Sequence, residues 1–260
     1  MKILSLNINS IRAHIESFAA VLESGEYDVV CVQEIKVDDT NFPHSLFDEY
    51  GYNIKVHGQK SYNGVAVFSK FSVEDVVRGM PGYGDPNARF MECVIDGRLR
   101  VINAYMPNGA DIDSPKFPYK IEWMTKFTEY IYQHLDSEEP VVICGDFNVA
   151  LTDRDVYNPK KFDGLSITAP AARKIMTEWL DNGWIDCWRR FNPDDAGYTW
   201  FAYYPHAVQK NEGLRLDYFL ANKTAGQLIK NCYINMYVRT AEKPTDHAGL
   251  VLEIQQQETI

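Results

Sequence analysis

The chain has 260 residues, of which 45% are hydrophobic and 24% charged, and its formal net charge is −10 at pH 7. This length suits one large α/β domain or two small ones, and the lack of an internal repeat or a linker favours one domain over residues 1–260. The acidic balance argues against a protein that coats DNA non-specifically, and no run is apolar enough to span a membrane.

Strand patterns outnumber helix patterns along the chain. Apolar runs predict strands at residues 2–8, 28–33, 64–69, 90–95, 99–105, 141–144, 215–221, 232–238 and 250–254. Helical spacing of apolar residues predicts helices at residues 11–24, 116–135 and 170–182, with Ser10 as a possible cap of the first. Asp96-Gly97 predicts a hairpin between two of the strands. These patterns indicate an α/β fold in which two sheets pack together with helices outside.

The N-terminus enters a strand pattern directly and lacks the extended apolar region of a signal peptide, so a cytoplasmic location is expected. The five cysteines are widely spaced and form no Cys-x-x-Cys pair. Cys31 and Cys144 lie inside apolar runs. We interpret the cysteines as reduced, buried thiols rather than as disulfides, a zinc site or a nucleophile.

Five apolar runs end in an acid, an amide or a histidine. The polar residues at these ends are Asn7, Glu34, Asp146 with Asn148, Asp217, and Asp246 with His247. Several such ends in one chain predict a single site at the rim of a sheet. Carboxylates together with His and Asn are the ligand types that hold a divalent metal over a phosphate.

The clearest of these ends is Gly145-Asp146-Phe147-Asn148. In an extended chain, Asp146 and Asn148 project to the same side and can approach one phosphate together. Asp146 could then orient and deprotonate a water molecule, while Asn148 donates an N–H to a phosphoryl oxygen that gains charge. The alternative interpretation is a turn, for which this sequence is equally suited.

Other strand ends have similar alternatives. Glu34 is either a solvated acid or an oxygen ligand of Mg²⁺, with Asn7 and Asn9 beside it. Asp217 lies inside a strand pattern and needs a partner, which a hydrogen bond to His247 would supply. His247 would then either bind metal or donate to a phosphate oxygen. The remaining histidines are interpreted as surface or packing residues: His14, His44, His57, His134 and His206.

Aromatic and basic residues supply candidates for substrate contacts. Tyr105 ends a strand, where its hydroxyl could reach a phosphate or its ring could simply pack. The aromatic stretch 198–204 is either core or a stacking surface for a sugar or base. Three basic pairs are either phosphate contacts or solvated charges: Lys116 with Lys120, Lys160 with Lys161, and Arg189 with Arg190.

In this order, the segments resemble the exonuclease III family of apurinic/apyrimidinic endonucleases, within the endonuclease/exonuclease/phosphatase superfamily that has the deoxyribonuclease I fold. The resemblance covers essentially the whole chain. It is carried by residues 7–12, 32–36, 58–60, 62–66, 102–109, 145–148, 198–201, 213–217 and 245–248. It implies a four-layer α/β sandwich of two packed mixed sheets flanked by helices, and phosphodiester hydrolysis that depends on Mg²⁺ or Mn²⁺.

The resemblance also implies a role for each matched residue. A metal cluster with Glu34 as principal ligand would comprise Asn7, Glu34, Asp146, Asn148, Asp246 and His247. Asp146 would activate water, Asn148 would stabilise the transition state, and Asp217 would orient His247, which donates to the phosphate that Tyr105 also contacts. Substrate-binding residues would be Asn108, Lys116, Trp200 and Leu216, the last two lining a pocket for an extrahelical abasic sugar.

The implied function is a DNA repair enzyme without an obligate protein partner. It would cut double-stranded DNA 5′ to abasic sites and remove nucleotides or blocking groups from damaged 3′ ends. Three alternatives stay open: a relative specialised for 3′-5′ exonuclease or 3′-phosphatase activity with weak abasic incision, a phosphodiesterase for a non-DNA ester such as an inositol phosphate, a sphingolipid or an RNA tail, and a non-enzymatic DNA-binding or partner-binding module.

The chain departs from the family pattern at Ser10, Ile35 and Gly249, none of which is a reacting group. Residues 157–169 also match the family poorly, although they fall where relatives place a helix beside the abasic pocket. Ile167 or a neighbour could crowd an extrahelical sugar there. We hypothesise that this segment sets the balance between internal incision and 3′-end trimming.

Overall fold

The computed structural model describes residues 1–255, and its framework is a pair of six-stranded sheets. From edge to edge, the first sheet contains β13 (Ile229–Asn235), β14 (Gly249–Ile254), β1 (Lys2–Asn7), β2 (Val29–Gln33), β4 (Val65–Ser69) and β3 (Asn53–His57). The second contains β5 (Val73–Arg78), β6 (Phe90–Ile95), β7 (Leu99–Tyr105), β8 (Val141–Asp146), β12 (Asp217–Ala221) and β9 (Ile185–Asp186). Both sheets are mixed, since β1 is parallel to β2 but antiparallel to β14, and β7 is parallel to β8 but antiparallel to β6.

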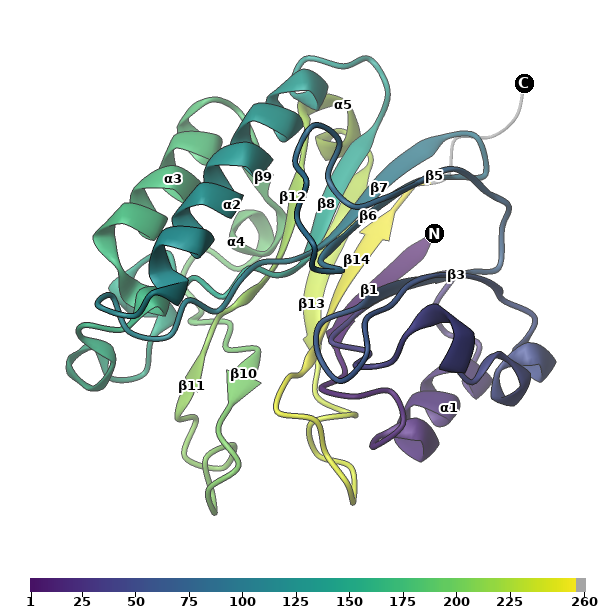
Figure 1. Cartoon of the computed structure of the whole chain (residues 1–260), viewed down its shortest axis with the longest axis horizontal. Helices are drawn as coiled ribbons and strands as arrows, with labels where there is room; N and C mark the ends of the chain where they lie inside the picture. Colours follow the sequence, from purple (N-terminus) through teal and green to yellow (C-terminus); the bar gives the residue numbers. More distant parts are fainter. Residues whose placement is uncertain (256–260) are drawn as a thin grey trace.

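Helices cover the outer faces of the two sheets (Figure 1). They are α1 (Ile15–Glu23) on the first sheet, α2 (Lys116–Ile131) and α3 (Pro170–Asp181) on the second, and the short α4 (Cys187–Phe191) and α5 (Lys223–Gly226). A separate hairpin is formed by β10 (Trp200–Phe201) and β11 (Gly213–Leu214). The predicted α/β fold of two packed mixed sheets flanked by helices is confirmed. Within residues 1–255, none of the helices is long and apolar enough to cross a membrane.

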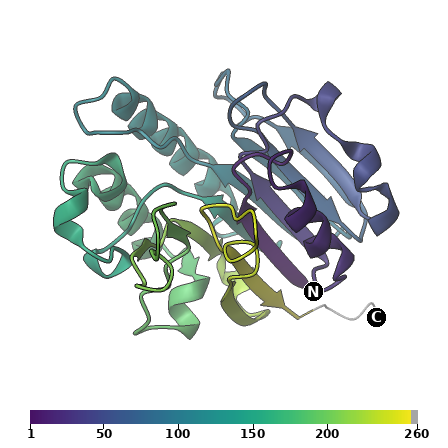
Figure 2. The same ribbon diagram turned by 90° about the horizontal axis from the view of Figure 1, so that it is seen from below.

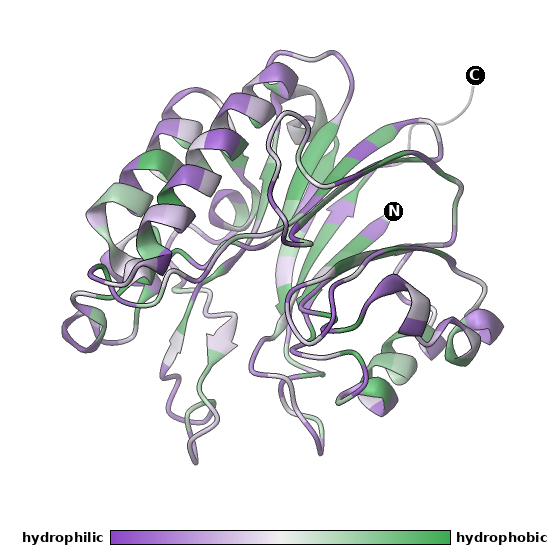
Figure 3. Cartoon of the chain, in the orientation of Figure 1, coloured by the Kyte–Doolittle hydropathy of each residue, from purple (hydrophilic) through white to green (hydrophobic). Residues whose placement is uncertain are grey.

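The alternation of side chains along each strand explains why the sheets pack in this way. In β1, Ile3 faces the core between the two sheets, whereas Leu4 and Leu6 face the cluster that contains α1. In β8, Cys144 faces the same inter-sheet core, whereas Ile143 faces the cluster under α2 and α3. Figure 3 shows hydrophobic residues along the strands and alternating character along the helices. The five cysteines are all buried and unpaired, as expected.

Several boundaries differ from those predicted. The first helix begins at Ile15 rather than at residue 11, and His14, not Ser10, occupies the cap position. Ser10 is held elsewhere, because its backbone N–H donates to the carbonyl of Glu34. The helix predicted to reach residue 135 ends at Ile131 and continues as a 3₁₀ turn. The strand predicted over 215–221 begins at Asp217, and the one predicted over 232–238 covers Ile229–Asn235.

Edge strands were harder to anticipate than central ones. The strands β3 and β5 lie at the outer edges of their sheets and carry polar residues such as Asn53, Glu74 and Asp75, so their hydrophobic signal is weak. The hairpin predicted at Asp96-Gly97 is present between β6 and β7. Both of its residues have positive φ, 55° and 61°, as a tight two-residue hairpin turn requires.

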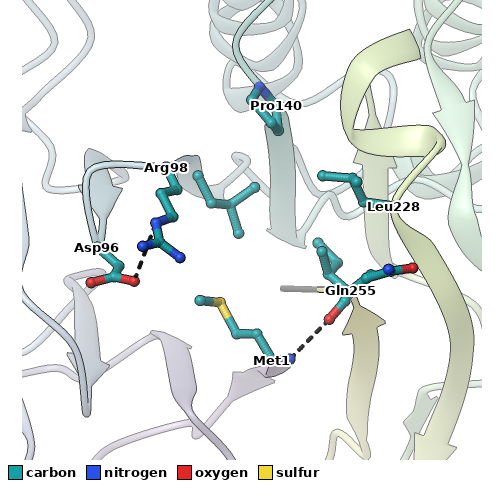
Figure 4. Close-up of a pocket in the computed structure, with 8 residues that line it drawn as sticks. Met1, Asp96, Arg98, Pro140, Leu228 and Gln255 are labelled. Carbon is teal, nitrogen blue, oxygen red and sulfur yellow. Dashed lines mark hydrogen bonds and ion pairs between the residues drawn. The ribbon is translucent and has the colours of Figure 1, made fainter. Parts of the chain in front are cut away.

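The ends of the central strands are brought together at one end of the molecule, the lower end in Figure 1, which Figure 2 shows from below. The β10–β11 hairpin and the loop before β14 project from this end (Figure 1). At the opposite end, a small pocket between the sheets is lined by residues that include Met1, Pro140 and Leu228 (Figure 4). Met1 precedes β1 and Pro140 precedes β8, so this pocket lies at the strand ends far from Asn7 and Asp146.

Candidate active site

Strand direction and register bring the predicted polar residues to one edge. Because β1 and β2 are parallel, Asn7 pairs with Gln33 and lies beside Glu34, the next residue. In the second sheet, Tyr105 pairs with Asp146 across the parallel β7–β8 pair, and Asp217 pairs with Asp146 across the antiparallel β8–β12 pair. The side chains at these ends therefore converge where the two sheets meet.

The amide of Asn7, in the first sheet, contacts carboxylates of both sheets at this edge. Asn7 Nδ2 donates to Glu34 Oε1 at 2.9 Å and to Asp146 Oδ2 at 2.9 Å. Glu34 also pairs with Lys36 Nζ at 2.9 Å. Burial disfavours ionisation of Glu34, but the Asn7 hydrogen bond and the Lys36 charge outweigh it and lower the pKa of that carboxyl. Glu34 is thus held as a carboxylate, and the Asn7 amide lies between it and Asp146.

His247 lies between two buried carboxylates. Its Nδ1 is 2.8 Å from Asp217 Oδ2, so the hydrogen bond expected between these residues is present. Its Nε2 is 3.8 Å from Asp146 Oδ2. Burial opposes the positive charge, but Asp217 and Asp146 outweigh that effect and raise the pKa of His247 to about 10. The imidazole is therefore a cation at neutral pH, with one ring nitrogen fixed by Asp217.

Asp146 is buried near two other carboxylates, and this environment disfavours its ionised form. Burial raises its pKa, the positive charge of His247 opposes that effect, and the nearby Asp217 and Glu34 add to it. The net result is a pKa above the ordinary range of an aspartic acid. An acid whose pKa is raised toward neutrality is suited to accept a proton during a reaction.

The Asp146–Asn148 segment is both a turn and part of the site. Asn148 N donates to Asp146 Oδ1 at 2.9 Å, which closes a turn, and Asn148 Nδ2 donates to Asp146 Oδ2 at 3.1 Å and to Met106 O at 3.0 Å. The φ of Asn148 is 51°, and Asn9, Glu34 and Lys36 also have positive φ. Backbone strain of this kind persists where the surrounding structure enforces it, commonly at functional sites.

Tyr105 lies against the same carboxylates. It is 8% exposed, and burial together with the charges of Glu34 and Asp146 raises the pKa of its hydroxyl, which stays protonated and able to donate. The Arg89 guanidinium stacks on its ring at 4.7 Å from the centroid. Arg89 was not identified from the sequence, which has no motif around it.

Asp246 connects this edge to a neighbouring apolar cluster. Its Oδ2 accepts a hydrogen bond from Trp200 Nε1 at 3.0 Å, and its Oδ1 accepts one from Asn9 Nδ2 at 3.0 Å. Trp200 in turn packs against a buried cluster that includes Leu216 and Ile167. The two residues expected to line a pocket thus share one apolar cluster with the segment 157–169.

The whole arrangement can be compared with known proteins. Residues 4–247 match the model of the endonuclease/exonuclease/phosphatase family. The chain belongs to this family. It is 32% identical to exodeoxyribonuclease III of Haemophilus influenzae, over 97% of this chain and 99% of that protein. Membership of the exodeoxyribonuclease III group of DNA repair nucleases follows from this match.

Solved structures agree with this family assignment. An AP endonuclease from Archaeoglobus fulgidus is 34% identical, with a TM-score of 0.93 over 98% of this chain and 99% of that chain. A 3′ phosphatase, NExo from Neisseria, bound to a product DNA hairpin, is 33% identical, with a TM-score of 0.94 over 98% of this chain and 100% of that chain. The two neighbours carry different activities in their names, so the shared fold alone does not specify the lesion.

Enzymes of this family are divalent-metal-dependent nucleases, and the donors at this edge fit a hard cation. In residues 1–255, no group of three or more His, Cys, Asp or Glu side chains is arranged so that it could hold a metal ion by itself. Two carboxylates, Glu34 and Asp146, lie at this edge, and Asn7 could add only its amide oxygen Oδ1, because its Nδ2 is a hydrogen-bond donor. Mg²⁺ is usually held by one or two carboxylates, with water and substrate phosphate completing its shell.

For the basic residues, the sequence left two interpretations open, phosphate contacts or solvated charges. Lys120 is fully buried, and its Nζ donates to backbone carbonyls, while burial lowers its pKa to about 7. Arg189 pairs with Asp155 at 2.8 Å. The expectation of exposed charges or phosphate contacts is therefore wrong for these two residues. Lys116 is exposed at the start of α2, and the structure records no contact to the residues above.

The sequence interpretation missed Lys36 as well as Arg89, and it did not foresee that Lys120 is buried. Lys120 lies three, four and seven residues before Trp123, Met124 and Phe127, which places it on the buried face of α2. Lys36 follows Glu34 by two residues within a segment that was recognised, but its pairing depends on a positive φ that the sequence does not reveal.

Proposed function

We propose that this chain is a Mg²⁺- or Mn²⁺-dependent DNA repair phosphodiesterase. It incises double-stranded DNA 5′ to abasic sites and removes nucleotides or blocking groups from 3′ ends. The observation that carries the proposal is the chain of contacts Asp217–His247–Asp146–Asn7–Glu34. It places an imidazolium, a carboxyl with a raised pKa and a partly exposed carboxylate next to one another.

Each residue of this line has a proposed role. Asp146, with its raised pKa, accepts a proton from the attacking water. His247, held as a cation by Asp217, donates from Nε2 to a non-bridging phosphate oxygen that gains negative charge. Tyr105 donates a hydrogen bond to the same phosphate, and its hydroxyl is already held at the site by the protein. Asn148 donates to it as well, by exchanging its hydrogen bond to Asp146 Oδ2 for one to the phosphate.

The cation would be held by Glu34, with Asn7 and Asp146 beside it, and would supply charge neutralisation of the phosphate. Protonated His247 has no lone pair for a metal, because both of its ring nitrogens carry a proton. We therefore assign His247 to the phosphate rather than to the metal. Asp246 accepts hydrogen bonds at both of its oxygens and is a more distant member of the cluster.

The pocket beside this line would accept the sugar at the lesion. Trp200 and Leu216 form its apolar wall, and Asn108 reaches the site through a 2.9 Å hydrogen bond from its Nδ2 to Asn148 Oδ1. Lys116, exposed at the start of α2, remains a proposed contact to a more distant phosphate. These contacts would place DNA across the end of the molecule shown in Figure 2.

One observation favours a second candidate, an enzyme specialised for 3′ ends with weak abasic incision. Ile167 is only 9% exposed and packs into the cluster of Leu214 and Leu216 that would line the sugar pocket. A bulky apolar side chain in that wall reduces the room for an extrahelical sugar. A nucleotide at a 3′ end has no downstream strand and can enter by another route.

We further propose that residues 1–260 form one domain, because the core between the sheets draws on both of them. The protein is expected to act on the chromosome in the cytoplasm without an obligate protein partner.

The test is incubation of the purified chain with three labelled duplexes, carrying an abasic analogue, a 3′-phosphate or a recessed 3′ end. We expect cleavage with Mg²⁺ or Mn²⁺ and none after chelation of the metal. Cleavage that persists in chelator would contradict the metal mechanism. If none of the three duplexes is cleaved, the proposal fails, and a non-DNA phosphate ester or a binding role becomes the better explanation.

A further inference from the structure

Lys120, a lysine buried behind the site, forms no ion pair within the part of the chain that the structure describes. Lys120 lies on the inner face of α2 and is fully buried. Within residues 1–255, no carboxylate lies within ion-pair distance of its Nζ. Lysine is rarely buried completely, because the desolvation of an ammonium group is costly unless other groups compensate. The contacts of Lys120 therefore indicate what it does.

Both contacts of the ammonium are with loops of the site. Lys120 Nζ donates to Asn148 O at 2.5 Å and to Asn108 O at 3.2 Å. Asn148 follows β8 and Asn108 follows β7, so one side chain ties together the two loops that also carry Asp146 and Tyr105. The two asparagine side chains are themselves joined, with Asn108 Nδ2 donating to Asn148 Oδ1 at 2.9 Å.

The loops close tightly on the lysine stem. Gly109 has a φ of +81°, and a Cβ added to it would meet Lys120 Cδ at 2.8 Å and Ser166 Cβ at 2.9 Å. Ser166 Oγ also donates to the carbonyl of Asn108. On the other loop, Asn148 has a φ of 51°, in the left-handed region that asparagine tolerates better than most residues. The Lys120 hydrogen bond holds the Asn148 carbonyl in place in this conformation.

We infer that Lys120 is a positioning residue, which fixes Asn148 and Asn108 so that their amides and the carboxylate of Asp146 face the scissile phosphate. This inference rests on the proposed function of the same site. It assigns the lysine to the geometry of the reaction and not to substrate binding, because its Nζ is enclosed behind the two loops.

The first test compares two variants in single-turnover cleavage of the best duplex. Lys120→Met keeps the length of the side chain and removes the donors, and we expect kcat to fall by about 100-fold with KM within about threefold, as a small misplacement of reacting groups would cause. Lys120→Arg restores donors and should recover most of kcat. A fall in Lys120→Met that Arg does not rescue, or a change in KM alone, would overturn the inference.

A double-mutant cycle separates positioning from a general loss of stability. In an Asn148→Ala background, Lys120→Met should lower kcat by no more than about threefold, because the group it positions is already gone. The control is Met124→Ala, since Met124 is fully buried on the same helix but packs in the core under α2. It should lower the melting temperature and leave kcat of the folded protein unchanged. Equal losses from Lys120→Met in both backgrounds would refute positioning.

A measurement independent of activity distinguishes failure of this inference from failure of the proposed function. Native-state hydrogen exchange at the amides of Asn148 and Ala110 should accelerate in Lys120→Met and not in Met124→Ala, because Lys120 holds the two loops that contain these amides. Unchanged protection at both amides would overturn the positioning role, whether or not the protein cleaves DNA. Accelerated exchange in a protein that cleaves none of the duplexes would retain the role and reject the function.

Discussion

The charge of His247 depends on one neighbouring residue more than on any other. Burial alone would lower its pKa, and Asp217 is the strongest of the groups that raise it to about 10. A raised folded-state pKa means that the proton is bound at neutral pH and lost only as pH rises through that value. Any step that needs the imidazolium is therefore supported below about pH 10 and lost above it.

Asp217→Asn should lower the pH above which His247 loses its proton. The substitution removes the negative charge at Nδ1, so the pKa of His247 falls toward its ordinary value and the alkaline limb of kcat/KM shifts to lower pH. The measurement is the pH profile of kcat/KM for wild type and variant on the same duplex. Alkaline limbs that superimpose would show that His247 does not act as a cation in the reaction.

Asp217 and His247 could be predicted as site residues because each is unusual in its local sequence. Asp217 is a charge inside an apolar strand pattern and requires a partner, and His247 is next to an acid just before the final strand. The bridge from Asn7 to Glu34 and Asp146 could not be predicted in the same way. It joins two sheets, and pairing between sheets leaves no local pattern in the sequence.

At the scale of elements, the segment 157–169 was predicted from the sequence to match the family poorly. It forms two short 3₁₀ helices, Pro159–Phe162 and Ser166–Thr168. Its contacts with the site include Ile167 in the apolar cluster and Ser166 at the Asn108 carbonyl. The segment therefore lies where it can alter both the pocket wall and the loop that carries Asn108.

Replacing residues 157–169 by the corresponding segment of a relative that incises abasic sites efficiently should change the balance of activities. We expect the ratio of abasic incision to 3′-end trimming to rise, because the wall beside Trp200 and Leu216 would open. Both rates are measured on matched duplexes. Ile167→Ala is the smaller variant, which should move the ratio in the same direction. An unchanged ratio in both variants would show that the segment does not control substrate choice.

Elements differed in how well the sequence anticipated them. Central strands such as β2 and β8 are continuous apolar runs and were located within two residues. The first helix was placed too early, because Ser10 and Ile11 bond to carbonyls of the Glu34 loop instead of starting a helix. These hydrogen bonds join segments that are distant in the sequence, so the periodicity of apolar residues within the helix could not predict them.

At the scale of the whole molecule, two features follow from the sequence and one does not. The many strands and the Asp96-Gly97 hairpin were enough to predict packed mixed sheets. The net charge of −10 is consistent with the proposed site, whose carboxylates would bind a cation. The order of the strands in each sheet could not be predicted from the sequence. The reason is that β12 pairs with β8, and β14 with β1, although the paired strands are far apart in the chain.

The two sheets meet so that Asp146 lies between a cationic imidazole, His247, and the carboxylate of Glu34, which we propose as a metal ligand. The most direct test is the single-turnover cleavage rate of Asp146→Asn with Mg²⁺ at neutral pH. We predict a loss of about 10³-fold or more, as expected for removal of a general base together with its charge. The control is Asp153→Asn, an exposed acid paired with Arg173, which should cleave at the wild-type rate. Near-normal cleavage by Asp146→Asn would contradict the assignment of this residue as the base.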